Sequence, residues 1–511
     1  MQKRVVFKQY HQQQISLLPP SLEELIPSNH PVRVVNEVLN KVDISKLEKE
    51  YKGGGTSSYH PRMLLKVLVF GYLSNIYSSR RIEFAIKENI NFMWLAGMSQ
   101  PDHNTINRFR GIRLQKTLKD IFTQVVELLV ESGHVSLQEV FIDGTKIEAN
   151  ANRYTFVWGK AIKTNRSKMQ AQLKELWEYA EKIAHIEKDE TTPTDFEPTD
   201  PEKVKATIEK INEALKTTTH LVDKKVKAKV NYAKNHFPDA IEKYNEQEKI
   251  LGERNSFSKT DHDATFMRMK EDHMGNGQLK PGYNVQISTE NQYITNYTLH
   301  QNPTDTKTLI PHLEEHANNY SQTPVVVVAD AGYGSEQNYE YLAELEATAY
   351  VKYSSFNKEQ HPSRVDKKPF TVEKLYYNKT KNEYICPMGQ AMHHIGTFTQ
   401  KTDAGYIRTL DKYQAKNCAT CPLNGICHKS KGNRIIEVSH RGNELKKQAQ
   451  ENLTVETGIY YRKKRCIEPE PVFGNIKHNK NFKRFMLRGL QKVNVETGLL
   501  ALAHNLKKKS A

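Results

Sequence analysis

The sequence predicts an α/β domain with a mixed sheet flanked by helices, joined to an all-α N-terminal domain and interrupted by two insertions. Two apolar runs, at 139–144 and 323–330, support the sheet, because a β-branched run without alternation is typical of a strand buried on both faces. Apolar residues at helical spacing in the first 135 positions support the N-terminal domain. At 511 residues, the chain is long enough for several domains.

The composition indicates a polyanionic partner. Lys and Arg total 75 against 59 Asp and Glu, a formal net charge of +16, and this favours nucleic acid over a membrane surface. The longest apolar run, at 63–73, is interrupted by Lys66 and is too short to span a bilayer. The first residues lack the pattern of a signal peptide. We therefore expect a cytoplasmic protein that works on nucleic acid, with no membrane partner.

The N-terminal domain, residues 1–135, is expected to be helical. Helices are predicted at 61–76, 79–88, 102–110 and 114–130, with Pro61 suited to a first helical turn. Short helices joined by tight turns and rich in arginine, including Arg108 and Arg110, favour a DNA-binding unit of the helix-turn-helix kind. A plain helical bundle with a solvated basic face is the alternative.

The sheet domain is assembled from three stretches, 136–159, 256–353 and 441–511. Strands are expected at 139–144, 283–289, 293–299, 323–330 and 347–353, with a helix at 304–317 and another after Ser335. This order resembles that of a ribonuclease-H-like mixed sheet. In that fold the first and fourth strands are neighbours, which would bring Asp143 and Asp330 together where open α/β sheets place their chemistry. Taken alone, Asp330 could be a turn residue.

Two insertions separate these stretches. Residues 160–255 predict a charged helical hairpin, with an acidic Pro/Thr linker at 187–202 that has no core-forming residues. Residues 354–440 contain four of the five cysteines, which fit a tetrahedral Zn²⁺ site better than a disulfide framework. The predicted ligands are Cys386, Cys418, Cys421 and Cys427. His428 could replace one of them, and a set of reduced, unliganded thiols is the alternative.

A third acidic position lies in a basic segment near the C-terminus. Between Tyr461 and Lys492 there are ten Lys or Arg and two acids, Glu468 and Glu470. If a helix starts at about Pro471, then Glu470, Lys477 and Arg484 share one face, presenting an acid to a metal ion and two cations to a phosphate backbone. The alternative is that both acids are surface partners of the lysines.

Four short motifs in the sheet domain resemble bacterial insertion-sequence transposases of the DDE type. They are IDGTKIEANA at 142–151, VADAGYG at 328–334, EPVFGNIK at 470–477 and FMLRGL at 485–490. The stretch SQPDHNTINRFR at 99–110 is similar to the helical N-terminal domain of that family. The resemblance covers most of 15–155 and 255–507 and leaves out the helical insertion.

The resemblance implies a metal-dependent active site. In that family two Asp and one Glu bind divalent metal, and the matching positions here are Asp143, Asp330 and Glu470. Two Mg²⁺ (or Mn²⁺) ions held by such oxygen ligands activate the attacking oxygen and stabilise the leaving one. Tyr461 and Arg465 do not keep the family's spacing from Glu470, and Glu468 is the second choice for the third ligand.

The resemblance also implies how DNA is bound and what is done to it. Lys477 would contact the phosphate of the transposon end, and the other expected DNA-binding residues are Lys146, Arg108, Arg110, Arg465, Arg484 and Arg488. The expected function is that of a nucleoid-associated transposase, working as a homo-oligomer, that binds terminal inverted repeats, cuts the ends and joins them to target double-stranded DNA. The alternatives are a non-catalytic DNA-binding regulator derived from a transposase and a stand-alone nuclease.

Overall fold

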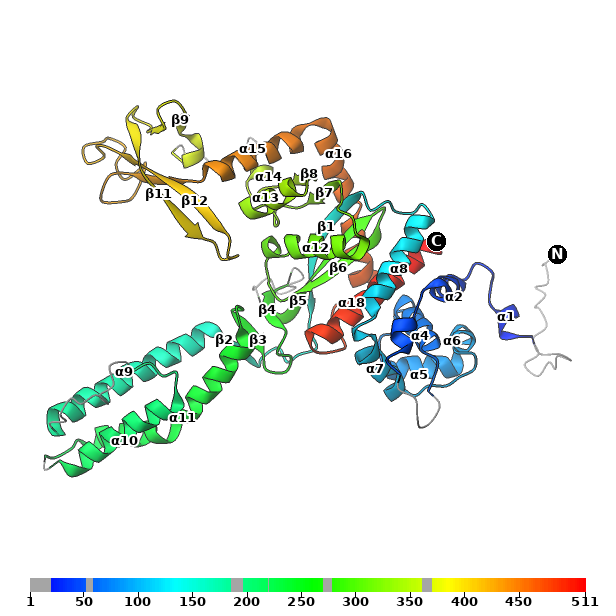
Figure 1. Ribbon diagram of the computed structural model, residues 1–511, viewed down its shortest axis with the longest axis horizontal. Helices are drawn as coiled ribbons and strands as arrows, with labels where there is room; N and C mark the ends of the chain where they lie inside the picture. The colour runs from blue at the N-terminus through cyan, green and yellow to red at the C-terminus, as the bar shows by residue number, and fades with distance from the viewer. Residues whose placement is uncertain (1–19, 52–57, 185–195, 219, 270–277, 361–369) are drawn as a thin grey trace, which may run out of the picture. The chain divides into compact units, whose positions relative to one another are not determined.

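A computed structural model describes residues 20–51, 58–184, 196–218, 220–269, 278–360 and 370–511 (Figure 1). The chain forms two compact units. One comprises residues 1–134 and 497–511, and the other comprises residues 135–496. The last part of the C-terminal helix, α18 (Leu490–Lys509), therefore belongs to the first unit, whereas the sequence analysis grouped it with the sheet domain. In the described residues, no helix is long and apolar enough to cross a membrane.

The first unit is helical. Its elements before α18 are α1 (Leu22–Leu25), α2 (Pro31–Lys41), α3 (Ser45–Glu48), α4 (Pro61–Leu73), α5 (Ser79–Glu88), α6 (Ile90–Leu95), α7 (His103–Gly111), the short 3₁₀ turn η1 (Arg113–Gln115) and α8 (Leu118–Glu131). Proline opens α2 and α4, and in both the preceding histidine caps the helix through its ring nitrogen. Helix α4 is buried along most of its length and forms the centre of the core.

A six-stranded mixed sheet forms the centre of the second unit. Its strands are β1 (Glu139–Glu148), β4 (Thr265–Arg268), β5 (Leu279–Glu290), β6 (Tyr293–His300), β7 (Val326–Ala329) and β8 (Thr348–Val351), in the order β4-β5-β1-β7-β8 with β6 also paired to β5. The sheet is mixed because β1 runs antiparallel to β5 but parallel to β7, and β7 runs parallel to β8. The expected pairing of the first and fourth strands is therefore confirmed.

Helices enclose the sheet in one apolar core. They are α12 (Leu309–Tyr320), α13 (Glu336–Glu344), α15 (His440–Thr454) and α16 (Glu456–Arg465). Val140 to Ile142 of β1 and Val327 to Ala329 of β7 pack with Leu313, Leu342 and Leu445 of these helices. Both strands are apolar without alternation because side chains on both of their faces are buried.

The insertion that follows β1 contains three helices where the sequence predicted two. Strands β2 (Phe156–Trp158) and β3 (Ser256–Ser258) pair at its base, and α9 (Gly159–Ala184), α10 (Pro201–Thr217) and α11 (Lys224–Leu251) extend from them (Figure 1). The third helix exists because a separate apolar stripe, from Val230 to Ile241, packs on the other two helices. Of the predicted acidic linker, residues 187–195 lie outside the described part of the chain.

The Cys-rich insertion is β-rich. Strands β9 (Tyr376–Asn378), β10 (Glu383–Ile385), β11 (Ala391–Lys401), β12 (Ile407–Ala415) and β13 (Ile435–Val438) form an antiparallel sheet in the order β13-β12-β11-β10-β9. Its core is small and aromatic, around Tyr384 and Tyr413.

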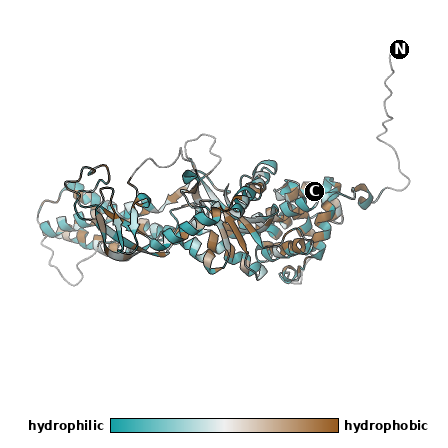
Figure 2. Cartoon of the chain, turned by 90° about the horizontal axis from the view of Figure 1, so that it is seen from above, coloured by the Kyte–Doolittle hydropathy of each residue, from teal (hydrophilic) through white to brown (hydrophobic). Residues whose placement is uncertain are grey.

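Figure 2 shows hydrophilic and hydrophobic segments side by side along most helices and strands, as expected for elements with one apolar face.

Candidate active site at the ends of the central strands

The two aspartates lie level with each other on neighbouring strands. Ile142 pairs with Ala329 in the parallel ladder between β1 and β7, so Asp143 and Asp330 are the next residues on each strand. Asp143 is still inside β1, whereas Asp330 is the first residue after β7. This register brings both carboxyl groups to the same edge of the sheet.

Arg465, the last residue of α16, lies among three carboxylates. Its Nη1 donates a hydrogen bond of 3.0 Å to Oε1 of Glu470. Its Nη2 is 3.6 Å from Oδ1 of Asp143 and 3.5 Å from Oδ2 of Asp330. The structure therefore brings Asp143, Asp330 and Glu470 around one guanidinium group.

The three carboxylates differ in their exposure. Side-chain exposure is 9% for Asp143 and for Arg465, 38% for Asp330 and 53% for Glu470. The cluster is therefore closed on the side of β1 and open on the side of Glu470. A large charged molecule would approach from the open side.

Glu468 takes a different position. It is buried, and its Oε2 accepts a hydrogen bond of 2.8 Å from the backbone N–H of Gln292. Burial raises the pKa of this carboxyl group, although the bond from Gln292 and the charge of Lys464 act in the opposite direction. Of the two candidates for the third acid, the structure brings Glu470 and not Glu468 to the aspartates.

The predicted stripe of Glu470, Lys477 and Arg484 on one helix is wrong. Helix α17 (Pro469–Gly474) is short, and a π-helical turn at Asn475–Asn479 follows it. The chain then leaves the helix, and Asn481 has a φ of 50°. A residue in the left-handed region cannot continue a right-handed helix, so Arg484 does not share a helical face with Glu470.

Three of the cations expected to bind DNA contact the backbone of their own unit. Arg484 donates to the carbonyl oxygens of Ala149 and Ala151 at 3.1 and 2.9 Å. Arg488 donates to the carbonyl of Asn150 at 2.7 Å. Lys146 donates to the carbonyl of Arg268 at 3.2 Å. The bonds of the two arginines attach the segment after the π-helical turn to the residues that follow β1, and the bond of Lys146 joins β1 to β4.

Arg108 and Arg110 of the helical unit differ in exposure. Arg110 is buried, and its Nη1 donates to the hydroxyl of Tyr72 at 3.1 Å and to the carbonyl of Tyr77 at 2.6 Å. The prediction that Arg110 binds DNA is therefore corrected, because its guanidinium group is used inside the helical core. Arg108 is exposed on α7. Lys477, in the other unit, is partly exposed in the π-helical turn.

A fourth carboxylate, that of Asp305, lies beside the site and was not predicted from the sequence. Its Oδ1 accepts hydrogen bonds of 2.7 Å from Asn284 and 3.0 Å from Gln286, both on β5. A Cβ atom on Gly332 would lie 3.3 Å from Oδ2 of Asp305 and 3.0 Å from Oδ1 of Asp330, so the two carboxylates are close. Buried polar residues at alternate positions of a central strand, such as Asn284 and Gln286, were the signal that could have found it.

Two further groups close the site. The hydroxyl of Tyr333 donates to Oε1 of Gln286. Complete burial, with the charges of Asp305, Asp143 and Asp330 nearby, raises the pKa of Tyr333 far above its ordinary value. Lys352, which follows β8, is half-buried, and burial together with the charge of Arg465 lowers its pKa. Acidic and basic groups are therefore concentrated at the ends of β1, β7 and β8.

The predicted zinc site is not supported by the arrangement of the cysteines. Cys386, Cys418, Cys421 and Cys427 line one small cavity, but in the described residues no three Cys, His, Asp or Glu side chains lie close enough to hold an ion. The guanidinium group of Arg434 lies among them and donates to Sγ of Cys427 at 2.9 Å. The structure shows four free thiols around an arginine.

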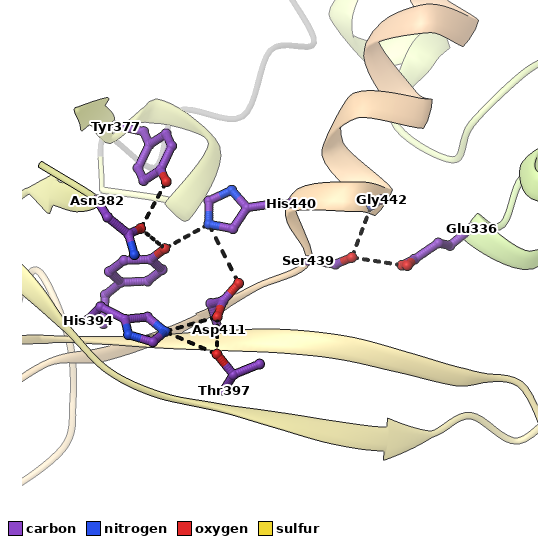
Figure 3. Close-up of polar contacts among 10 residues, drawn as sticks. Glu336, Tyr377, Asn382, His394, Thr397, Asp411, Ser439, His440 and Gly442 are labelled. Carbon is purple, nitrogen blue, oxygen red and sulfur yellow. Dashed lines mark hydrogen bonds and ion pairs between the residues drawn. The ribbon is translucent and has the colours of Figure 1, made fainter. Parts of the chain in front are cut away.

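A polar cluster joins the Cys-rich insertion to α15 (Figure 3). His394 of β11 lies 2.9 Å from Oδ1 of Asp411 of β12, and His440 at the start of α15 lies 3.9 Å from its Oδ2. The hydroxyl of Tyr413 is 2.7 Å from Nε2 of His440. Burial raises the pKa of Asp411, but hydrogen bonds from Thr397 and His394 and the charges of the two histidines outweigh burial and lower it.

Two comparisons with protein families match parts of the chain. A family described as "Transposase DDE domain" matches residues 385–509, and a family described as "Transposase domain (DUF772)" matches residues 20–111. Together these matches support an insertion-sequence transposase of the DDE type. The first match contains Glu470, Arg465 and Lys477, and the second contains Arg108. No curated protein and no solved structure matches the chain.

The DDE transposase family that matches the C-terminal part of the chain implies the use of divalent metal. The three carboxylates of this transposase fit such an ion in kind, because they supply hard oxygen donors and already surround one cation. They do not fit it as they are placed, since in the described residues no three such side chains form a group that could hold an ion. The guanidinium group of Arg465 lies among the oxygens that would be the ligands.

Proposed function

We propose that this transposase binds the terminal inverted repeats of its element, hydrolyses the phosphodiester bonds at the ends, and joins the freed ends to target DNA. The observation that supports this best is the convergence of Asp143, Asp330 and Glu470, from three separate segments, on one cation. The mixed sheet with parallel central strands is compatible with a ribonuclease-H-like catalytic domain. The net charge of +16 favours DNA as the partner.

In this proposal the three carboxylates are the metal ligands. Divalent ions held there would supply an activated oxygen nucleophile and would stabilise the leaving oxygen, with no covalent protein intermediate. Asp143, which is buried in β1, fixes the position of the site on the sheet. Asp330 and Glu470, which are more exposed, form the side on which the scissile phosphate is received. Asp305 and the amides of Asn284 and Gln286 hold the loops beneath the site in place.

Lys477 and Arg108 are the proposed contacts to DNA phosphate. Both are at least partly exposed, Lys477 in the π-helical turn that follows α17 and Arg108 on α7 of the helical unit. We propose that a homo-oligomer assembled on paired ends is the active form and that it works at the bacterial nucleoid. Loss of phosphate contacts should weaken binding to all duplexes and reduce the dependence of binding on salt.

The test is cleavage of a labelled duplex that carries the DNA flanking the coding region, in Mg²⁺. Asp143→Asn, Asp330→Asn and Glu470→Gln should each abolish cleavage and leave duplex binding in gel-shift experiments intact. Glu444→Gln is the control, because Glu444 is an exposed residue of α15 whose ion pair, among the described residues, is with Arg441 at 3.9 Å. Binding without cleavage by the unaltered chain under any divalent metal would identify a non-catalytic regulator and contradict the proposal.

A further inference from the structure

Arg465 is the basic group closest to all three catalytic carboxylates, yet it is incompletely hydrogen bonded. Only the contact with Glu470, at 3.0 Å, is a hydrogen bond. The contacts with Asp143 and Asp330, at 3.6 and 3.5 Å, are ion pairs too long for one. The Nε atom is buried and finds no hydrogen-bond partner among the described residues. The guanidinium group therefore neutralises the acids without being fixed by them.

We propose that Arg465 is a positioning residue that occupies the place of the metal before DNA binds and moves to a DNA phosphate when the site is loaded. This inference rests on the proposed metal site at Asp143, Asp330 and Glu470. It adds that metal binding and DNA binding are coupled through one side chain.

The charges at the site explain the first half of the inference. Three carboxylates within reach of one another repel, and Asp305 adds a fourth negative charge beside them. The cation among the three in this structure is Arg465. A divalent ion needs the same oxygen atoms, and it is repelled by a guanidinium group that contacts them. Metal therefore binds well only after Arg465 has left.

The local structure explains where Arg465 can go. It ends α16, and its long side chain reaches the acids from the last helical turn. Its basic neighbours are held elsewhere: Lys464 pairs with Glu139 at 2.7 Å, and Arg462 donates to the carbonyl of Leu453 at 3.0 Å. Rotation of one side chain about its own bonds would release it. Helix α16 does not have to move.

DNA phosphate is the ligand that matches the released group. The planar guanidinium fork binds phosphate with two parallel hydrogen bonds, more than the one that Glu470 accepts. Glu470 is also the most exposed of the three acids, so a phosphate that approaches from the open side meets the Arg465–Glu470 pair first. A bound DNA end therefore draws Arg465 away and leaves the carboxylates to the metal. By linkage, metal must strengthen DNA binding by the same factor.

The experiment measures Mn²⁺ binding to the full chain by the loss of the free-ion EPR signal, with and without the end duplex. Without DNA, Arg465→Gln should bind Mn²⁺ at least tenfold more tightly than the unaltered chain. Arg462→Gln, which removes a cation from the same helix but none from the acids, should bind Mn²⁺ as the unaltered chain does. Adding the duplex should raise the affinity of the unaltered chain and change that of Arg465→Gln much less.

Stability gives a second readout that does not depend on cleavage. In EDTA, Arg465→Gln should melt at a lower temperature than the unaltered chain, because the acids have lost their counter-cation, and Mn²⁺ should restore its stability. If this variant does not fold without metal, Arg465→Lys decides. One ammonium group cannot reach three carboxylates as the fork does, so its Mn²⁺ affinity without DNA should still exceed that of the unaltered chain.

The outcomes separate the inference from the proposed function. Equal Mn²⁺ affinity in the unaltered chain and the Arg465 variants, without DNA, overturns the role of Arg465 and leaves the metal site standing. No Mn²⁺ binding to any of these chains, even with the end duplex, overturns the proposed metal site and the inference with it. Tight, DNA-independent binding by the unaltered chain also overturns the inference.

Discussion

Replacing Gly334 by alanine should destabilise the catalytic sheet. A Cβ atom at this position would lie 2.4 Å from the carbonyl oxygen of Lys352 and 2.9 Å from Cα of Tyr353. Ordinary contacts are about 3.5 Å. The overlap is therefore about 1 Å, and it is with backbone, which cannot rotate away as a side-chain end can. Either the end of β8 moves off β7 or the loop after Asp330 moves.

The cost can be approximated from the two changes that this requires. Overpacking of this kind costs about 1–3 kcal/mol. Opening the end of the β7–β8 ladder, where the Lys352 N–H approaches the Ala329 carbonyl at 3.5 Å, adds about 1 kcal/mol. The free energy of unfolding should therefore fall by roughly 2–4 kcal/mol.

Guanidinium denaturation followed by circular dichroism measures this loss, and hydrogen exchange in β7 and β8 locates it. Gly474→Ala is the control. Gly474 is helical, and beyond its own stretch of helix no atom of the described residues would lie within 4 Å of an added Cβ. Alanine should therefore stabilise the protein by about 0.5–1 kcal/mol. If Gly334→Ala were as stable as the unaltered chain to within about 0.5 kcal/mol, the close approach of the Asp330 loop to β8 would be refuted.

Three further predictions follow from buried polar groups. Arg110→Gln should lower the stability of the helical unit by about 1–3 kcal/mol because it leaves buried acceptors without a donor. Arg108→Gln should leave thermal melting unchanged and weaken DNA binding. The reverse pattern would contradict the buried position of Arg110 and the exposed position of Arg108. Tyr333→Phe should cost about 1–3 kcal/mol in urea unfolding because Gln286 loses its donor, and a change near zero would show that this bond is not formed. Burial lowers the pKa of His300 from 6.5 to about 4, so the stability that the neutral imidazole contributes is present above pH 6.5 and is lost as the pH falls toward 4. The free energy of unfolding should fall by at most about 3 kcal/mol over this range. His300→Asn should remove this part of the pH dependence measured by denaturation.

The level placement of Asp143 and Asp330 was predictable from the sequence because local features carry it. Each of the two apolar runs is followed at once by an aspartate, with a glycine one or two positions later. Only the pairing of β1 with β7 was then needed, and the order of elements gives that pairing. Helix α5 begins and ends where the spacing of its apolar residues predicts, at Ser79 and Glu88.

Other features depend on contacts that sequence spacing does not contain. Arg465 reaches Asp143 across 322 positions of the chain, so its place among the acids follows from the packing of α16 against the sheet and not from any local pattern. Asp305 lies in a 3₁₀ turn, η2 (Asp305–Lys307), and its partners are buried amides on another strand. The prediction that Arg484 shares a helical face with Glu470 failed for a local reason, because the helix ends before Arg484. Asn481 tolerates the left-handed region better than most residues, and this was a signal that the helix stops.

The most direct test of the proposed active site compares two glutamates only two positions apart. Glu470 contacts Arg465 beside the aspartates, whereas Glu468 is buried against the backbone of Gln292. In Mg²⁺-dependent cleavage of the end duplex, Glu470→Gln should be inactive. Glu468→Gln should cleave at nearly the rate of the unaltered chain, since an amide oxygen can accept the same hydrogen bond. Cleavage that survives in Glu470→Gln and is lost in Glu468→Gln would contradict the site.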